Sequence, residues 1–364
     1  MGFNCGIIGL PNCGKSTIFN ALTSAGATAS SFAFSTVEPN VARVTVPDER
    51  LDRIVEIVKP KKTVYTQMEF VDIPGLSEGA SRGEGMGNRF LSHVRSVDAI
   101  VYVVRCFESK EMAAADTLDP LRDIGIVESE LMLADLESVE KKMQTIKKSA
   151  KKAKMEKGKP EDALVFMERL EKIADGLQRE IPASQTGGWD IVKELPLLTT
   201  KPVMVVANLG DPSQENGPMV KAIRDYAQKH GAACVAVCGQ LEAEISELEP
   251  EERQTFMEEM GLKQSGLHTL IQEGYKLLGL VTFLTAGPKE ARAWTIRKGM
   301  SAPEAAGKIH TDFVKGFIRA EVITFDDYME CGGENGAKDK GKMRLEGKEY
   351  IVKDGDVILF RVAT

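Results

Sequence analysis

The segment Gly9-Leu-Pro-Asn-Cys-Gly-Lys-Ser16 decides the fold of this 364-residue chain. It matches the pattern G-x-x-x-x-G-K-[ST], whose residue types suit a bound triphosphate. Glycine lets the backbone approach phosphate oxygens closely, and the free N–H groups at the start of a helix attract their negative charge. Residues 3–8 have the pattern of a buried strand and residues 16–23 that of a helix. The sequence therefore predicts a strand, a phosphate-binding loop and a helix in succession.

Two side chains of this loop have separate chemical roles in the predicted site. The Lys15 ammonium is expected to reach the β- and γ-phosphates and to act in catalysis. The Ser16 hydroxyl is expected to bind Mg²⁺. We regard an ordinary glycine-rich turn as the weaker reading, because the strand before the loop and the helix after it are the required context.

A second motif, Val71-Asp-Ile-Pro-Gly75, follows the strand pattern of residues 67–72. We expect Asp72 to hold Mg²⁺ through water, and the backbone N–H of Gly75 to bond a γ-phosphate oxygen and move away after hydrolysis. Thr36 lies between the two motifs and is a candidate switch threonine whose hydroxyl would bind Mg²⁺. The alternative reading of Thr36 is an ordinary loop residue.

The residue after Gly75 is Leu76, where many regulatory GTPases have a glutamine that orients the attacking water. Leucine has no polar group for this task. Intrinsic hydrolysis is therefore expected to be slow, or the water must be positioned by another group. The alternatives are a partner, a K⁺ ion near Asn12, or a residue of the glycine-rich segment 77–88.

The sequence Asn208-Leu-Gly-Asp211 follows another strand pattern and is a candidate base-recognition site. A guanine site usually has Asn-Lys-x-Asp, in which the carboxylate accepts both guanine N–H groups. Leu209 replaces the lysine and weakens the guanine reading, whereas Asp211 keeps it open. Cys238 and Gly239, after the next strand pattern, are expected to form the last wall of the base pocket.

Apolar runs interleaved with helical patterns predict an α/β fold with a doubly wound, mostly parallel sheet whose ligands bind at the carboxyl ends of the strands. These runs are residues 3–8, 67–72, 99–106, 203–208 and 233–238. From about residue 281 the pattern changes to short strands at 281–285, 291–296, 349–352 and 357–361, around a helix beginning near Ala302-Pro303. We therefore expect a nucleotide-binding domain over 1–280 and an α+β domain over 281–364.

Between residues 106 and 203 no strand pattern is evident, and apolar residues recur three or four apart. This spacing predicts two long antiparallel helices, an inserted arm over about 120–185, broken at Gly158-Lys-Pro160. Residues 141–159 contain nine Lys and one Glu. This basic run is either a solvated helix face or an electrostatic footprint for RNA or a ribosome.

Composition sets broad limits on function. Hydrophobic residues make up 43% and charged residues 28% of the chain, as in soluble globular proteins. The net charge of −7 argues against a protein that coats nucleic acid with its whole surface. The six cysteines lack zinc-finger spacing, and no apolar run is long enough to span a membrane. We find no signal-peptide pattern and expect a cytoplasmic protein.

With these motifs placed, the chain resembles the YchF / Obg-like ATPase family of translation-factor-class P-loop proteins over essentially its whole length. Five stretches carry the resemblance: Met1-Gly-Phe-Asn-Cys-Gly-Ile-Ile-Gly-Leu-Pro-Asn12, Val104-Arg-Cys-Phe-Glu108, Ala293-Trp-Thr-Ile296, His310-Thr-Asp-Phe-Val-Lys-Gly-Phe-Ile-Arg-Ala320 and Tyr350-Ile-Val-Lys-Asp-Gly-Asp356. The resemblance implies a nucleotide-binding domain, a coiled-coil arm and a C-terminal TGS domain of β-grasp type. It also implies Mg²⁺-dependent hydrolysis of ATP at least as good as that of GTP, and association with ribosomes, RNA and stress responses.

The family's site residues carry over by position. The resemblance implies that Asn12, Cys13, Gly14, Lys15, Ser16 and Thr17 surround the phosphates. It further implies that Ser16 and Thr36 bind Mg²⁺, and that Leu209 touches the base. One departure bears on specificity, because the family tends to have Glu at the fourth position of its Asn-x-x-Glu motif, where this chain has Asp211.

Three hypotheses about function follow. The first is a slow ATPase, or GTPase, in which water attacks the γ-phosphate. The second is a nucleotide-gated adaptor for a ribosome or RNA, with hydrolysis as a timer or negligible. The third, a small-molecule kinase, has less support, because the motif Asp72–Gly75 is typical of switch proteins and no acceptor pocket is evident in the sequence.

Overall fold

The computed structural model divides into two compact units. The large unit comprises Asn4–Ala42 and Glu69–Leu270, and the small unit comprises Met1–Phe3, Arg43–Met68 and Ile271–Thr364. The structure describes residues 3–24, 39–74, 86–108, 118–153, 161–262 and 264–363. The side chains of 86–88, 149–153, 161–163 and 250 lie outside this description.

The large unit is built on a six-stranded sheet with the order β2-β4-β1-β5-β6-β7. Its strands are β1 (Asn4–Ile8), β2 (Asn40–Thr45), β4 (Gln67–Asp72), β5 (Ala99–Cys106), β6 (Val203–Leu209) and β7 (Ala233–Val237). β1 pairs in parallel with β4 and β5, β5 with β6, and β6 with β7. The five predicted strands are confirmed to within one residue at each end, and β2 is an additional strand.

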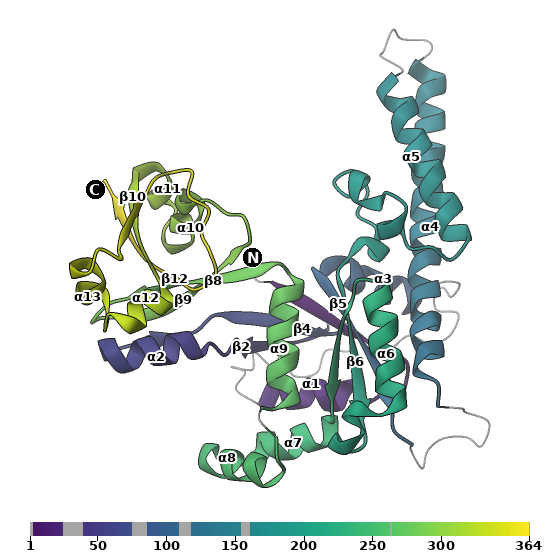
Figure 1. Cartoon of the computed structure of the whole chain (residues 1–364). Helices are drawn as coiled ribbons and strands as arrows, with labels where there is room; N and C mark the ends of the chain where they lie inside the picture. The colour runs from purple at the N-terminus through teal and green to yellow at the C-terminus, as the bar shows by residue number, and fades with distance from the viewer. Residues whose placement is uncertain are drawn as a thin grey trace. The chain divides into compact units, whose positions relative to one another are not determined.

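Both faces of this sheet are covered, as a doubly wound fold requires (Figure 1). Ile100, Tyr102 and Val104 of β5 pack in one cluster with side chains of α3, α4 and α6. Val101 and Val103 alternate with them, are equally buried and so face the opposite side. Helices α1 and α7 pack together on that side. The helices are α1 (Lys15–Ser24), α3 (Met86–Ser96), α4 (Pro120–Ala153), α6 (Pro218–Lys229), α7 (Gly239–Glu247) and α8 (Pro250–Glu259). A further helix, α9 (Gly266–Leu277), begins in the large unit and ends in the small unit.

The predicted helical arm is confirmed as α4 followed by α5 (Glu161–Gln178), which lie side by side (Figure 1). Val139 of α4 and Ile173 of α5 are fully buried in their shared apolar cluster. Three 3-10 helices, η2 (Ala183–Gln185), η3 (Gly188–Ile191) and η4 (Leu198–Thr200), return the chain to β6. The predicted break at Gly158-Lys-Pro160 lies outside the described residues.

The base of the arm is fixed by one buried carboxylate on α4. Asp135 accepts hydrogen bonds from the backbone N–H groups of Leu198 and Thr199, each at 2.8 Å. The Thr199 hydroxyl adds a third bond at 2.7 Å.

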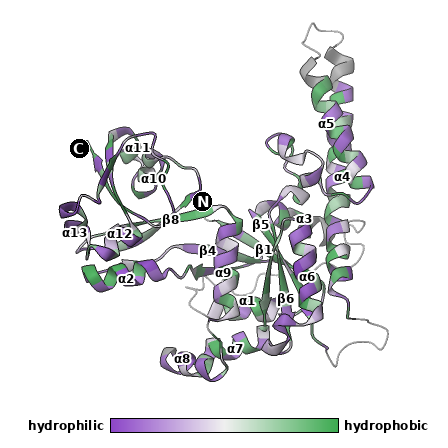
Figure 2. Ribbon diagram, in the orientation of Figure 1, coloured by the Kyte–Doolittle hydropathy of each residue, from purple (hydrophilic) through white to green (hydrophobic). Residues whose placement is uncertain are grey.

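Figure 2 shows hydrophobic residues concentrated in the inner strands and hydrophilic residues on the outer surfaces of the helices. Among the described residues, no helix is long and apolar enough to cross a membrane.

The small unit contains a mixed sheet with the order β11-β10-β12-β8-β9-β3. Its strands are β3 (Thr63–Val64), β8 (Leu280–Ala286), β9 (Ala291–Arg297), β10 (Phe317–Thr324), β11 (Arg344–Glu346) and β12 (Asp356–Val362). β8 pairs antiparallel with β9 and parallel with β12, and β10 is antiparallel to β12 and β11. The predicted α+β architecture is therefore confirmed.

A helix covers one face of this second sheet. Ala302, Ala305 and Ala306 of α10 (Ala302–Ile309) pack with Phe283 and Phe360 of the sheet. The predicted helix start near Ala302 is confirmed, with a capping box formed by the residue before it. The remaining helices are α11 (Asp312–Gly316), α12 (Phe325–Glu330) and α13 (Glu334–Asp339).

The predicted strand over residues 349–352 is wrong. This segment makes only one isolated antiparallel bridge, between Ser301 and Ile351. Val352 is buried in the core, but Ile351 is 48% exposed, so the apolar residues do not form a paired strand. The third and fourth strands along the C-terminal segment are instead β10 and β11.

Residues Arg43–Met68, which lie between the first two sequence motifs, belong to the small unit. Leu51 and Ile54 of α2 (Glu49–Val58) are fully buried against Leu284 and Tyr328. The small unit therefore includes an early chain segment in addition to Ile271–Thr364, whereas the sequence pattern indicated a single segment from residue 281.

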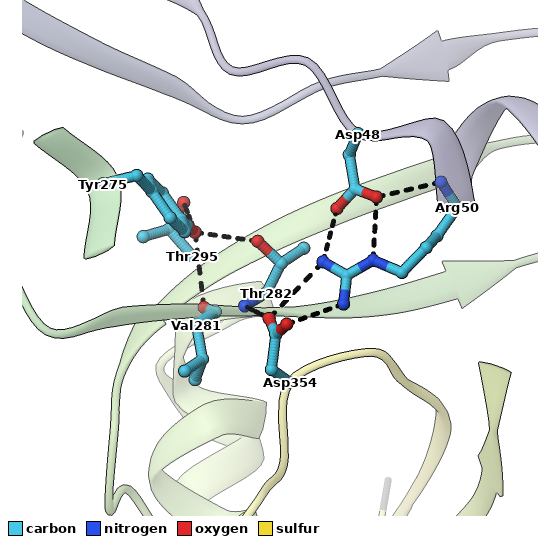
Figure 3. A network of polar contacts seen from close by, with 7 residues as sticks. All are labelled: Asp48, Arg50, Tyr275, Val281, Thr282, Thr295 and Asp354. Atoms are coloured by element: carbon cyan, nitrogen blue, oxygen red, sulfur yellow. Dashed lines mark hydrogen bonds and ion pairs between the residues drawn. The ribbon is translucent and has the colours of Figure 1, made fainter. Parts of the chain in front are cut away.

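A polar network holds α2 in the small unit (Figure 3). Arg50 donates to Asp354 through Nη1 at 2.7 Å and to Asp48 through Nε at 2.9 Å and Nη2 at 2.8 Å. One oxygen of Asp354 accepts from the backbone N–H of Thr282 at 2.8 Å. The Tyr275 hydroxyl lies 2.9 Å from that of Thr282. The network thus connects α2, β8, α9 and the segment before β12.

Candidate nucleotide-binding site

The predicted phosphate-binding loop connects β1 to α1 at the carboxyl edge of the large sheet. Asn12 and Gly14 adopt left-handed backbone angles, with φ of 62° and 84°. A Cβ on Gly14 would lie 2.1 Å from the Asn208 amide nitrogen, and a Cβ on Gly9 would lie 2.6 Å from the carbonyl oxygen of Val103. Both glycines are therefore required by close packing, and α1 begins directly at Lys15.

Asn208, at the end of β6, connects three of the predicted site segments. Its Nδ2 donates to the carbonyl oxygen of Cys13 at 2.9 Å, and its Oδ1 accepts from the N–H of Gly239 at 3.0 Å. The side chain is buried, so these bonds are shielded from water. Asn208 thereby holds the phosphate-binding loop and the start of α7 in a fixed register.

Lys15 and Asp72 form an ion pair between Nζ and Oδ1, although they are far apart in the sequence. Asp72 ends β4, which pairs in parallel with β1, and this pairing brings the two residues to the same edge. Both side chains are mostly buried, at 11% and 16% exposure, so their charges are less screened than those of surface pairs. The cation expected at the phosphates therefore lies beside the carboxylate expected to hold Mg²⁺.

The Cys13 thiol belongs to the packing of this loop. It is 3% exposed, and burial raises its pKa to about 11. A thiol with a raised pKa is a poor nucleophile at neutral pH. We assign Cys13 a structural role, in which its carbonyl oxygen accepts from Asn208 and its side chain fills space.

Asp211 directs one carboxylate oxygen into its own turn. Oδ1 accepts from the Ser213 backbone N–H at 2.8 Å and from the Ser213 hydroxyl at 2.6 Å, which caps η5 (Pro212–Asn216). These bonds hold the pKa of Asp211 below its usual value. Leu209 is 4% exposed and packs in the core cluster that includes α6. With Cys238, it also lines a cavity of about 510 Å³.

Two family models match this chain, one near each end of the sequence. The family model described as "50S ribosome-binding GTPase" matches residues 4–130, and the model YchF-GTPase_C, described as "Protein of unknown function (DUF933)", matches residues 280–363. The protein named "Ribosome-binding ATPase YchF" from Escherichia coli O157:H7 is 50% identical over 99% of both chains. Its namesake from Bacillus subtilis is 49% identical with the same coverage.

This chain belongs to the YchF family. The solved structure of the Schizosaccharomyces pombe YchF GTPase covers 99% of this chain and 98% of its own, with a TM-score of 0.85 and 33% identity. A GTP-binding protein from Pyrococcus horikoshii has a TM-score of 0.60 at 18% identity, over 99% of this chain and 100% of its own, which shows a shared fold. The resemblance read from the sequence is confirmed.

The structure brings part of the predicted YchF site together. Ser16 and Thr17 lie in the first turn of α1 and are exposed at the loop. Thr36, Gly75 and Leu76 lie outside the described residues. Within the described part of the chain, no group of three or more His, Cys, Asp or Glu side chains is placed to hold a metal ion.

A magnesium site in a YchF protein does not need such a group of side chains. Mg²⁺ is usually held by one or two protein ligands, with phosphate oxygens and water completing its octahedral shell. The exposed Ser16 hydroxyl and the Asp72 carboxylate are oxygen donors of this kind, so the residues present suit the ion. The sequence did not indicate that Asn208 would connect two loops. Its signal in the sequence was its position in the Asn208–Asp211 motif, at the end of an apolar strand pattern.

Proposed function

We propose that this protein is a Mg²⁺-dependent nucleoside triphosphatase that hydrolyses ATP, with GTP as a second substrate. The ion pair between Lys15 and Asp72 supports this proposal most directly, because it joins a phosphate ligand and a magnesium ligand from two separate motifs. The name "Ribosome-binding ATPase" of relatives with 50% identity agrees with the same activity.

In the proposed reaction the protein positions groups and stabilises charge. Backbone N–H groups of residues 12–17 surround the phosphates, and Lys15 neutralises the charge that develops on the γ-phosphoryl oxygens. Ser16, Thr36 and Asp72 would hold Mg²⁺, which supplies further charge neutralisation at the phosphates. The Gly75 N–H would bond a γ-phosphate oxygen. Leu76 leaves water positioning to a partner, K⁺ near Asn12 or residues 77–88.

Lys15→Ala tests this mechanism. We expect loss of roughly 100-fold or more in turnover, because a preorganised charge at the transferred phosphoryl group is removed. Lys221→Ala, on the exposed surface of α6, is the matched control and should retain wild-type turnover. Equal rates for Lys15→Ala and the control would contradict the proposal, as would transfer of labelled phosphate to a metabolite instead of water.

We propose ATP as the preferred nucleotide because Asp211 does not present a free carboxylate. One of its oxygens is held by Ser213, whereas guanine recognition needs both oxygens aligned with two N–H donors. Calorimetric titration with ATP and GTP analogues and Mg²⁺, on the wild type and on Asp211→Glu, tests this. Tighter ATP binding by the wild type is expected, and tighter GTP binding would show that Asp211 reads guanine.

We further propose that the protein associates with ribosomes through the basic run of residues 141–159, and that this run contacts RNA. Lys141, Lys147 and Lys148 are exposed on α4, and counterion release makes such contacts strongly salt-dependent. The amount of protein that cosediments with ribosomes should fall steeply as the salt concentration rises. Because ribosomes are cytoplasmic, we also propose a cytoplasmic location. If ribosomes leave turnover unchanged, the nucleotide-gated adaptor is favoured over the ribosome-stimulated ATPase.

A further inference from the structure

A second cavity of the large unit lies at the edge of the sheet opposite the phosphate-binding loop. It has a volume of about 310 Å³ and is lined by Pro202 and Val203, where β6 begins, and by Ala232, just before β7. Helices α4 and α6 and the returning 3-10 segment supply the rest of its wall. The nucleotide site lies at the carboxyl ends of the same strands, so the two sites are separate.

This cavity contains a partly buried acidic group and a buried hydroxyl. Glu128 of α4 and Tyr226 of α6 both line it. A hydrogen bond between them shifts the pKa of each, but its geometry is poor, and among the described residues the Tyr226 hydroxyl has no better partner. Burial raises the pKa of Glu128, while Tyr226 and His230 lower it. A buried hydroxyl without a partner is uncommon in folded proteins and indicates room for a ligand or water.

Aromatic rings surround this polar pair. The rings of Tyr226 and His230 stack with their centroids 4.1 Å apart. Tyr102 lines the cavity from β5, and Trp189 lines it from η3 with 54% of its surface exposed. The faces of the tyrosine and tryptophan rings carry negative electrostatic potential and attract organic cations.

The charges around the cavity also favour a cation. α6 ends at its wall, and the carbonyl groups of a helix C-terminus carry a partial negative charge. Two basic side chains, Lys201 and His230, line the cavity. The Lys201 ammonium donates to the carbonyl oxygens of Arg95 and Val97, so it is occupied by the end of α3. His230 is occupied in a similar way, because its Nδ1 lies 2.8 Å from the carbonyl oxygen of Tyr226.

We propose that this cavity binds a small organic cation, with an ammonium or guanidinium group at Glu128 and Tyr226 and an apolar body among Tyr102, Trp189 and Met132. The carboxylate accepts a charge-assisted hydrogen bond from the cation, and the Tyr226 hydroxyl accepts a second. The volume is at the lower end of the range for small-molecule sites, which limits the ligand to about the size of an aromatic amine.

Intrinsic fluorescence gives a direct test. The chain has two tryptophans, so Trp294→Phe leaves Trp189 as the only one. In this background we expect benzylamine to change Trp189 emission with a saturable dependence on concentration. Benzyl alcohol, which has the same body without the charge, should bind at least about 10-fold more weakly, since a charge-assisted hydrogen bond is lost. Equal binding of the alcohol, or no saturable change with the amine, would overturn the proposal.

Paired variants locate the binding. Glu128→Gln should weaken benzylamine binding by about 10-fold or more, and Tyr226→Phe should weaken it by a smaller factor. Glu137→Gln, on the exposed side of the same helix, should leave it unchanged. Unaltered thermal unfolding and ATP affinity would show that the variants are folded. Wild-type benzylamine affinity in Glu128→Gln would exclude the assigned site.

A final comparison distinguishes two sources of the cation. N-acetylarginine amide represents an arginine side chain of a peptide, and benzylamine represents a free amine. We expect tighter binding of benzylamine, because a volume of about 310 Å³ leaves little space for a peptide backbone. Tighter binding of the arginine derivative would overturn the assignment to a free small molecule. Neither probe occupies the proposed phosphate site. A failure of cation binding can therefore be told apart from a failure of the proposed ATPase function.

Discussion

At the scale of single residues, Asn208 and Gly14 show how the phosphate-binding loop is held. The Asn208 amide reaches the Cys13 carbonyl on one side and the Gly239 N–H on the other. Gly14 leaves room for that amide, because any side chain there would occupy the same space. The loop conformation thus depends on Asn208, which lies 195 positions after Cys13 in the sequence.

We predict that Asn208→Ala destabilises the protein and weakens nucleotide binding. The change leaves a buried carbonyl and a buried N–H without partners, which costs about 2 kcal/mol or more. Chemical denaturation would measure the change in the free energy of unfolding, and calorimetry the affinity for ATP. Asn216→Ala, at an exposed position in the η5 turn, is the control. Equal stability of the two variants would show that the Asn208 bridge is unimportant.

Gly14→Ala and Gly231→Ala form a matched pair. Both residues have positive φ, at 84° and 65°, so each substitution costs about 1 kcal/mol in backbone strain. Only the Gly14 substitution also collides with Asn208, whereas in the described part of the chain nothing lies within 4 Å of a Cβ added at Gly231. We expect Gly14→Ala to lose at least about 1 kcal/mol more in denaturant unfolding. A larger loss at Gly231 would contradict the packing argument.

At the scale of elements, α2 is held in the small unit by apolar packing and by Arg50. The guanidinium of Arg50 binds the carboxylates of Asp48 and Asp354 together, and these carboxylates raise its pKa further above the usual value (Figure 3). Asp354 also accepts from the N–H of Thr282, so one carboxylate connects α2 to β8. The helix is therefore fixed to residues more than 200 positions away in the sequence.

We predict that Arg50→Ala lowers stability by about 1 kcal/mol. The guanidinium is 27% exposed and the Asp354 carboxylate 52%, so solvent screens part of the interaction. Thermal or denaturant unfolding of the small unit would measure the loss. Arg179→Ala, which removes an exposed i,i+4 pair with Asp175 at the C-terminal end of α5, should change stability much less. A larger effect at Arg179 would contradict the assignment.

Glu321 on β10 provides a prediction about pH. Its hydrogen bond with Arg361, at 2.9 Å, is the main cause of a pKa below the usual 4.5, and burial acts in the opposite direction. The folded pKa is lower than the unfolded one, so the stabilisation is present above pH 4.5 and disappears as pH falls through the folded pKa. The stability difference between wild type and Glu321→Gln should therefore be largest near neutral pH. A difference that grows on acidification would contradict this sign.

At the scale of the whole molecule, the chain leaves the large unit, contributes a segment to the small unit and returns to the large unit between the two predicted nucleotide sensors. Thr36 precedes the segment Arg43–Met68, and Asp72 follows it. β2 and β4 each begin in one unit and end in the other. The small unit thus includes chain that is inserted within the nucleotide-binding sequence.

We predict that residues 271–364 alone do not form a stable unit. Without Arg43–Met68, the side chains that cover Leu51 and Ile54 lose their apolar partners and face water. The fragment should bind a hydrophobic dye and unfold at low denaturant concentration. Linking residues 43–68 to it should restore a cooperative transition. A cooperative transition of 271–364 by itself would show that the early segment is dispensable.

Much of the large unit follows from local sequence patterns. The phosphate-binding loop, the five predicted strands and the helical arm depend on residues near one another in the chain, because side-chain periodicity and glycine placement determine strands, helices and tight turns locally. The same local patterns predict the roles of Lys15 and Ser16. They were insufficient for residues 349–352, where an apolar run lacks a strand partner along its length.

Tertiary structure decided the features that depend on residues distant in sequence. Parallel pairing of β1 with β4 places Lys15 beside Asp72, and the end of β6 places Asn208 between two loops. Asp211, by contrast, caps its own turn through Ser213, a local contact two residues away that the base-recognition motif does not specify. The sequence by itself therefore determined the fold class and the family. The tertiary structure decided which side chains meet, because hydrogen bonds and ion pairs require specific distances that periodicity does not encode.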